Sequence, residues 1–500
     1  MGSFASPDVT LALMRCTGYV DMLPTDTKMK RFSKLRCAVP VLVFAMALPA
    51  LPSCGGAPDS ARSAQRHLVR GDYPAATAAA ERSIAKHPKD PTSWRVRIRS
   101  AMAQGELALA AEHYQEWKTL HGGHDRTTYR LMAVSTLWQG MQVPAPEIIS
   151  RTIHIIASNN VEKLASEVRD ALGNDSDLVA ASAAVALLRS HPAAPHLATE
   201  LLASASPRVR ALVVAGIGKK IGRKALGDLL PALSDVDPLV RRAAVSAIAS
   251  WKNKKDAARL ISIAASDTDG QVRSRALRGL LAKGGDGVVA LAQAALDDSY
   301  LGAQLAGLAL LEKFSEADAI ERAKVLVNQP HVGLAMRAAV ILYKNDGVAQ
   351  NQAIAKAFAS PDWSSRAAAL NTAAEVMSEA DAAALAKQGL ADVHEDVRIA
   401  AARLLIRLGD VDAGRKALAR ALGSNQLAPR LAAATELARM GDAAAIALLG
   451  QLARSGNAEQ RQAALGAHKT AKVLSDGLVA ALGDENIDVR LAAADALLFL

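Results

Sequence analysis

One arginine, preceded in most cases by valine, recurs along the second half of this chain and constrains the fold more than any other feature. Its steps run from 29 to 33 residues. The members are Arg210, Arg241, Arg273, Arg337, Arg366, Arg398, Arg430, Arg461 and Arg490, with Gln304 at the place expected in the one gap. A period of this length indicates stacked repeats, because one such unit cannot bury its apolar side chains alone.

The spacing of apolar residues within a unit is helical. Residues 240, 243, 244, 247 and 248 are apolar and follow the i, i+3, i+4, i+7 pattern, and an earlier run at 226–233 does the same. Gly409-Asp410 predicts a left-handed helix end followed by a helix cap, and Asp237-Pro238 predicts a cap in the other turn. Half of the chain is apolar but only 3% is aromatic, which suits closely packed small and aliphatic helices. We therefore expect an all-α solenoid.

These features resemble the short HEAT repeats named after phycobilisome lyases. The resemblance implies about ten hairpins over residues 147–500, stacked into a rod or arc on the order of 100 Å long with a concave face. Leu500 falls in the middle of a second helix without a polar cap. We expect that the chain is a fragment or that another subunit covers this end.

A second period stands nearer the N-terminus. Gly71 maps on Gly105 at a distance of 34 residues, with Ala76 on Ala110, and proline at position 88 closes the first unit. This pattern resembles tetratricopeptide repeats. We expect tetratricopeptide-like hairpins over residues 63–146.

The first 54 residues look like an export signal. Five basic residues between 28 and 36 precede an apolar run from 38 to 51, which is too short and too interrupted by proline for a membrane span. The following Leu51-Pro52-Ser53-Cys54 resembles the cleavage box of bacterial lipoprotein precursors, with proline in place of a small residue. The resemblance implies a signal over residues 1–53, a lipid on Cys54 and a tether over residues 54–62. The residues before Met29 do not have the layout of an export signal, so we expect translation to start at Met29.

The recurring arginine has two interpretations. Aspartate stands six residues before it, or before Gln304 in the gap, in five repeats, at 235, 267, 298, 392 and 484, and serine stands there in others. We favour an Arg–Asp ladder between neighbouring repeats, since arginine binds carboxylates in a bidentate way. Binding of an anionic ligand is the other interpretation.

Lysine or arginine also recurs late in successive second helices. The ordinary explanation is that cations favour helix C-termini, where the macrodipole is negative. The alternative is a basic ridge that binds an anion or a partner. Its densest part is Lys219, Lys220, Arg223, Lys224, Lys252, Lys254 and Lys255. The net charge is +10, of which about +7 remains after residue 53, a mild bias rather than a nucleic-acid signature.

Three sequence patterns resemble catalytic, metal-binding or phosphate-binding motifs, but each lacks the other residues that such a motif requires. Ser83 and Lys86 have the S-x-x-K spacing of penicillin-recognising enzymes without companion motifs. His121 and His124, with a third histidine at 113, lack a further metal ligand. The glycine-rich residues 215–220 complete no phosphate-binding motif, and we expect an inter-helix turn there. All three cysteines precede residue 55, so no thiol remains for catalysis or zinc. We expect no catalytic residue, metal or cofactor.

The sequence therefore favours a non-enzymatic scaffold, lipid-anchored in the bacterial cell envelope on the periplasmic or outer-membrane face, that binds protein partners through its repeat surface. Neither nucleic acid nor a small-molecule substrate is expected as a partner. Two alternatives stay open. One is a lyase or isomerase that acts on a chromophore or chromoprotein, as the name of the resembled family implies, and the other is a binder of a polyanion such as nucleic acid or acidic glycan.

Overall fold

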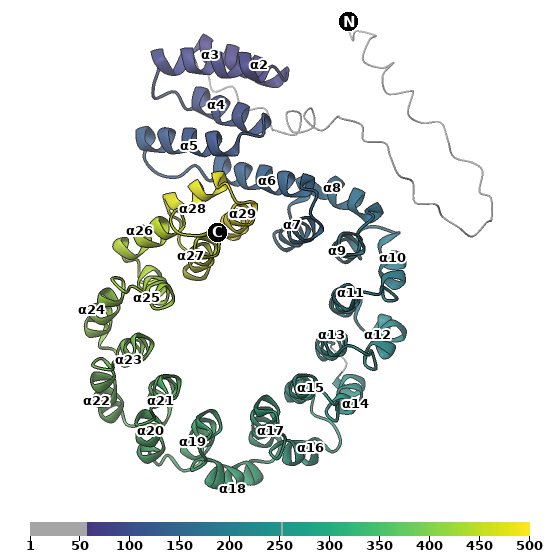
Figure 1. Ribbon diagram of the computed structural model, residues 1–500, viewed down its shortest axis with the longest axis vertical. Helices are drawn as coiled ribbons and strands as arrows, with labels where there is room; N and C mark the ends of the chain where they lie inside the picture. The colour runs from purple at the N-terminus through teal and green to yellow at the C-terminus, as the bar shows by residue number, and fades with distance from the viewer. Residues whose placement is uncertain (1–57, 252–253) are drawn as a thin grey trace, which may run out of the picture. The chain divides into compact units, whose positions relative to one another are not determined.

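The computed structural model describes residues 58–251 and 254–500, which all belong to the second of two units, 39–500. This part contains 28 α-helices, a few short 3-10 turns and no strand (Figure 1). The predicted all-α solenoid is confirmed. The expected signal, residues 1–53, and the expected lipid attachment at Cys54 lie outside the described residues.

The helices form consecutive hairpins. The four N-terminal helices are α2 (Asp59–Val69), α3 (Tyr73–Lys86), α4 (Pro91–Ala103) and α5 (Leu107–His121). The first helices of the following hairpins are α6 (Arg126–Gln142), α8 (Ala165–Asp170), α10 (Ala194–Leu201), α12 (Leu226–Ala232), α14 (Lys254–Ala264), α16 (Val288–Ala295), α18 (Glu316–Leu326), α20 (Asn351–Phe358), α22 (Glu379–Gly389), α24 (Val411–Ala421), α26 (Ala443–Leu452) and α28 (Asp476–Ala480). The second helices are α7 (Pro146–Ser158), α9 (Asp177–Leu187), α11 (Pro207–Lys220), α13 (Pro238–Ala249), α15 (Gly270–Lys283), α17 (Leu301–Phe314), α19 (Val332–Asp346), α21 (Trp363–Val376), α23 (Glu395–Arg407), α25 (Leu427–Arg439), α27 (Ala458–Ala471) and α29 (Ile487–Phe499). The short 3-10 turns are η2 (Glu162–Leu164), η3 (Ala171–Gly173), η4 (Gly222–Ala225) and η5 (Ala481–Gly483).

The turns use the residues that the sequence predicts. Asp237 caps α13 by accepting a hydrogen bond of 2.7 Å from the amide of Leu239, and a proline follows it at the first helical position. Gly409 has a φ of +91° and lies between α23 and α24, where left-handed backbone favours glycine. Asp410 then caps α24. These local signals fix where each helix begins and ends.

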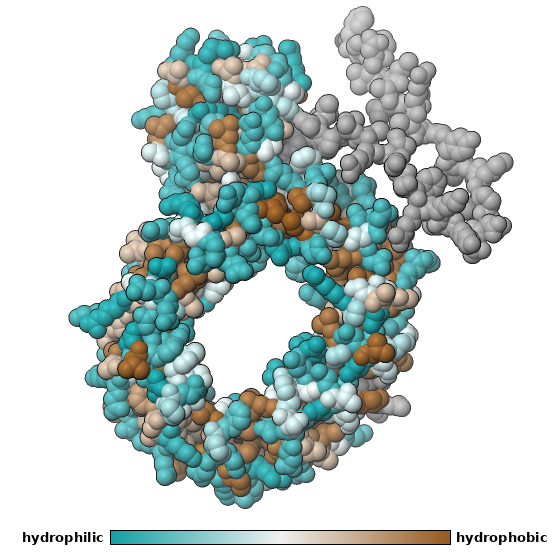
Figure 2. Space-filling model, viewed as in Figure 1, coloured by the Kyte–Doolittle hydropathy of each residue, from teal (hydrophilic) through white to brown (hydrophobic). Residues whose placement is uncertain are grey.

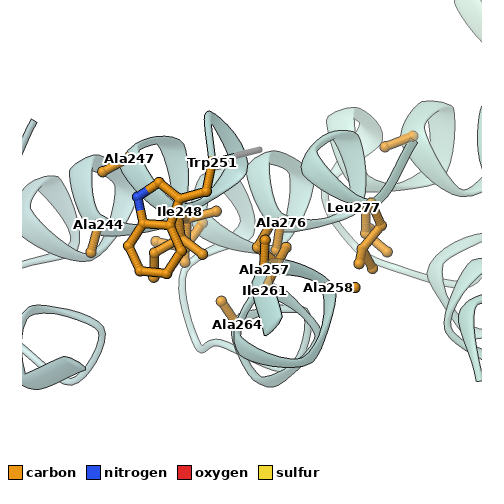
Figure 3. Packing of buried hydrophobic residues seen from close by; sticks show 14 of the residues in the cluster. Ala244, Ala247, Ile248, Trp251, Ala257, Ala258, Ile261, Ala264, Ala276 and Leu277 are labelled. Atoms are coloured by element: carbon orange, nitrogen blue, oxygen red, sulfur yellow. The ribbon is translucent and has the colours of Figure 1, made fainter. Parts of the chain in front are cut away.

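The core lies between the two helix layers and between neighbouring hairpins. Figure 3 shows this packing at α13, α14 and α15, where Ile248, Ile261 and Leu277 meet alanines from all three helices. Ile248 and Ile261 are fully buried. Each such side chain contributes roughly 1.5–3 kcal/mol of hydrophobic stabilisation. Small alanines allow the helices to approach closely, as the low aromatic content predicts.

The glycine-rich residues 215–220 are part of helix α11, so the predicted turn there is wrong. The glycines permit close helix packing instead. A Cβ on Gly216 would lie 2.5 Å from a methyl carbon of Val185 in α9, and one on Gly218 would lie 2.1 Å from the Cβ of Ala247 in α13. The turn begins one residue after α11, at Ile221.

The repeat array closes on itself, and the expected rod or arc is wrong. The last helix, α29, packs against α6, and one apolar cluster contains both helices together with α7 and α27 (Figure 1). Leu491 of α29 and Leu137 of α6 are fully buried in it. Arg126 and Arg130 of α6 donate hydrogen bonds of 3.1 and 3.3 Å to the carbonyls of Leu500 and Leu498. The same chain therefore covers the helix that we expected another subunit to cover.

A second contact at the closure joins α5 to the segment before α29. Gly483 at the end of η5 lies against the backbone of α5, where an added Cβ would stand 2.8 Å from the Cα of Ala108. Lys118 of α5 forms an ion pair with Asp476, and Gln115 donates a 3.2 Å hydrogen bond to the Asp476 carbonyl. The N-terminal hairpins are thus attached to both ends of the array.

Two of the expected boundaries differ from the structure. Helix α2 begins at Asp59, so the last residues of the expected tether, 54–62, are helical. The apolar cluster that contains Trp94 continues past Pro146 to Ala183, so packing is continuous across the expected boundary at 146. The reason is that α6 is shared, because it packs on α7 and also on α29.

Candidate binding surface

The second helices border a central opening. Figure 1 shows the second helices, which are the odd-numbered ones from α7 to α29, on the inner side and the first helices on the outer side. Figure 2 shows the opening in the space-filling view. Consecutive second helices pack directly on one another around this inner surface. A partner that enters the opening would meet side chains of many repeats at once.

The recurring arginine forms the first of two ladders between repeats. Arg241 donates from Nε and Nη2 to Asp267 of the next repeat, at 2.7 and 2.8 Å, and from Nη1 to the Asp235 carbonyl at 2.8 Å. The other pairs of this kind are Arg210–Asp235, Arg273–Asp298, Arg366–Asp392 and Arg461–Asp484. The aspartate stands six residues before the arginine of the next repeat, or before Gln304 in the case of Asp298, so each pair joins adjacent hairpins.

The remaining four of the nine arginines, all within the described residues, make no such pair. Arg337 pairs with Glu312 instead, and Arg398 pairs with Glu395 on its own helix at 3.3 Å. Arg430 has a buried Nε without a hydrogen-bond partner, and Ser455 occupies the place of the aspartate. Arg490 donates only to backbone carbonyls at 2.7 and 3.0 Å. The ladder is therefore interrupted between α17 and α21 and again between α23 and α27.

The cations late in the second helices form the second ladder. Lys220 donates a 2.6 Å hydrogen bond to the Ala186 carbonyl near the end of the preceding second helix, and Lys313 donates one of 2.7 Å to the Leu281 carbonyl. Lys283 bonds the Trp251 carbonyl in the same manner, whereas Arg407 bonds the carbonyl of Asn371, five residues before the end of α21. Helix C-termini leave carbonyls unpaired and carry negative dipole charge, so these cations stabilise the preceding repeat.

The lysines of the expected basic ridge differ in whether their ammonium groups are free or bonded. Lys219 and Lys224 are exposed, whereas the ladder contact of Lys220 occupies its ammonium group. Burial, together with the neighbouring Arg189 and Lys219, lowers the pKa of Lys220. Arg223, Lys254 and Lys255 lie on described backbone whose side chains are not described, and Lys252 lies outside the described residues.

A different set of cations lies on the second helices that border the opening. Arg208 of α11, Arg242 of α13, and Arg275 and Arg278 of α15 line two shallow pockets of about 470 and 520 Å³. The pockets share Ser246 and Arg275, so they form one groove across the second helices α7, α9, α11, α13 and α15 and the start of α17. We call these four residues the groove arginines.

The groove arginines have only neutral partners. Arg242 donates to the Pro238 carbonyl at 3.1 Å and to the side chain of Gln271, and Arg275 donates to the Ser246 hydroxyl at 2.8 Å. In contrast to the ladder arginines, they form no ion pair with any described carboxylate, and neither pocket has an acidic residue in its lining. Their positive charge is therefore available to a ligand.

Sequence reasoning missed the groove arginines because they lack a fixed period. Arg242, Arg275 and Arg278 follow the ladder arginines of their helices by one, two and five residues. Those offsets lie on the same side of a helix. Counting charge at these offsets in successive repeats would have found them.

The residues considered for other chemistry have structural partners. Ser83 is buried and accepts a 2.8 Å hydrogen bond from Ser60. His121 bonds the carbonyls of Trp117 and Lys89, whereas His124 faces Tyr114 and Asp476. Within residues 58–251 and 254–500 no cluster of His, Cys, Asp and Glu suits a metal, and no helix has the length and hydropathy for crossing a membrane.

Comparison with known proteins agrees with this architecture. The sequence pattern of HEAT repeats matches residues 194–281 and 382–469. A search of curated proteins finds no match. The chain is thus an all-helical solenoid that contains HEAT repeats.

Several solved structures are similar at low identity. A Kap121p mutant is 12% identical, with a TM-score of 0.34, over 86% of this chain and 56% of that one. The complex of CpcE and CpcF of phycocyanin lyase from Nostoc sp. PCC7120 is 19% identical, with a TM-score of 0.23, over 57% and 90%. The Cnd3-Cnd2 condensin subcomplex of S. pombe is 15% identical, with a TM-score of 0.31, over 86% and 68%. The chain therefore spans little more than half of the Kap121p chain that it matches.

Proposed function

We propose that this protein is a non-enzymatic scaffold that binds a protein partner through the inner surface of its HEAT repeats. The observation that carries the proposal is the continuous inner surface of second helices, which the two ladders hold in register. The two inner pockets described above are shallow and open to the surface, which suits a macromolecular partner better than an enclosed substrate. The tetratricopeptide-like interpretation of α2 to α5 belongs to the same proposal, as a second interaction module.

The proposal places the protein in the bacterial cell envelope, anchored by a lipid on Cys54. The basic segment, the apolar run and the small residues before Cys54 in the sequence support this part. We expect wild-type protein to incorporate radiolabelled palmitate and to sediment with membranes, since a lipid chain and the adjoining segment hold it there. Exchange of Cys54 for alanine should abolish the label and release the protein. A Cys54→Ala variant that still carries the label would rule out this anchor.

Photo-crosslinking in envelope fractions tests the partner. A crosslinking amino acid at Ala215, exposed in α11, and at Asn371, at the register position of Ser246 in α21, should capture the same protein. The control position is Val325 of outer helix α18, which is 58% exposed. Capture at Val325 alone, or at none of the three positions, would contradict a scaffold that binds through its inner surface.

A further inference from the structure

We propose that the groove arginines bind an extended acidic segment of the partner, in which apolar side chains adjoin several carboxylates. This inference rests on the proposed function, because it takes the partner to be a protein. It adds the site on the inner surface and the chemistry of the segment that binds there.

The two pockets of the groove differ in their apolar surface. The pocket across α7, α9, α11, α13 and α15 combines aliphatic side chains, among them Leu178, Leu212 and Leu239, with three of the groove arginines. Leu239 is 42% exposed although it is a large apolar side chain. The pocket across α13, α15 and the start of α17 is lined by serines, Gln271 and two of the groove arginines. A segment that lies along the groove thus meets arginines in both pockets and leucine surface in the first pocket only.

The charge of the arginines favours carboxylates in the segment that binds. Arginine keeps its charge at any physiological pH, and its planar group binds carboxylates in a bidentate way. Arg275 donates one hydrogen bond to Ser246, and its other N–H groups can bind a ligand. The N–H groups of the exposed Arg278 can do the same. Because no carboxylate among the described side chains neutralises them, binding of an acidic segment would form ion pairs without breaking any that the structure describes.

The leucine surface of the first pocket favours a polypeptide over a nucleic acid. Proteins that hold single strands stack bases on aromatic side chains, whereas Tyr300 is the one aromatic residue in the two linings. A polyphosphate backbone would use the guanidinium groups and leave the leucine surface exposed. An acidic segment with adjoining apolar residues uses both.

The test uses full-length purified protein and fluorescence anisotropy. The probe is a fluorescein-labelled peptide of about twelve residues, with two leucines followed by four glutamates. Companion probes replace the glutamates by glutamines or the leucines by serines, and an oligo-dT of similar charge represents nucleic acid. The groove variant is Arg242→Gln, Arg275→Gln and Arg278→Gln combined. The control variant, with Arg322→Gln, Arg420→Gln and Arg454→Gln, removes equal charge from exposed positions on or beside outer helices.

We expect the groove variant to weaken binding of the glutamate peptide by about tenfold or more, and the control variant to change it less than about twofold. The glutamine and serine probes should each bind more weakly than the parent peptide. Equal binding by the groove variant, equal binding of the glutamine probe, or tighter binding of oligo-dT would overturn the inference.

The crosslinking experiment distinguishes an error in the proposed acidic-segment site from an error in the proposed scaffold function. If the groove variant still captures the same protein at Asn371, the scaffold function stands and the groove is the wrong site. If wild-type protein captures nothing while the peptide binds as expected, the acidic-segment site stands and the scaffold proposal falls.

Discussion

Exchange of Arg241 for alanine is expected to lower the free energy of unfolding by about 2–3 kcal/mol. Arg241 and Asp267 are only 12% and 11% exposed, and the guanidinium also binds the carbonyls of Asp235 and Val236. Its removal leaves the Asp267 carboxylate and two carbonyls without their partner, which costs more than an exposed ion pair would. Urea unfolding followed by circular dichroism measures the change.

The interrupted ladder supplies a matched control. Arg430 occupies the same position in its repeat, but Ser455 replaces the aspartate, so the variant Arg430→Ala should cost less than about 1 kcal/mol. Exchange of Ser455 for aspartate should complete the pair and gain about 0.5 kcal/mol, and this gain should vanish when Arg430 is alanine. Equal losses for Arg241→Ala and Arg430→Ala would show that the pair with aspartate contributes little.

The same pair predicts a dependence on pH. Burial alone would raise the pKa of Asp267, but hydrogen bonds from Arg241 and from the Asp269 amide outweigh it and lower the pKa. Because the carboxylate binds a proton less readily when folded, its stabilisation is complete above the ordinary carboxyl pKa of about 4 and is lost as the pH falls below it. The stability difference between wild type and Arg241→Ala should therefore be large at neutral pH and smaller near pH 3.

Local structure was predictable from the sequence because its causes are local. The helical spacing of apolar residues, Gly409 in its left-handed turn and the cap at Asp237 each act within one hairpin. Closure of the array is different, because it buries Leu491 and Leu137 in one cluster although they lie more than 350 residues apart in the sequence. Curvature accumulates from small rotations between hairpins, and a repeat pattern does not specify their sum.

The binding surface was predictable only in part. The period of Arg241 and its preceding aspartate indicated a contact between repeats, since both members recur. The density of lysines near Lys220 in the sequence suggested a basic binding ridge, yet the Lys220 ammonium group donates to a carbonyl of the neighbouring helix. Arg242 and Arg278 stand out only when helix faces are aligned across repeats. Recurrence in sequence marks contacts that every repeat needs, whereas a ligand contacts a few repeats and leaves no period.

Exchange of Gly483 for leucine is expected to loosen the closure of the array. A Cβ at this position would lie 2.8 Å from the Cα of Ala108, and the backbone of α5 cannot turn aside as a flexible side chain would. The segment η5 must then separate from α5, at a cost of about 1–3 kcal/mol. Small-angle scattering should show a larger radius of gyration, and amide hydrogen exchange should increase in α5 and α29.

Two other repeats carry the same Ala-Leu-Gly sequence and serve as controls. A Cβ on Gly423 would have one neighbour within 4 Å, the Arg420 carbonyl at an ordinary 3.6 Å, and one on Gly173 would have none. Leucine at either position should leave scattering and exchange in α5 unchanged, although the local sequence and the change are the same. If all three variants behave alike, the effect belongs to the turn itself and the contact between α5 and η5 does not hold the array closed. If Gly483→Leu alone opens the array, the closure is a separate contact on which the shape of the inner surface depends.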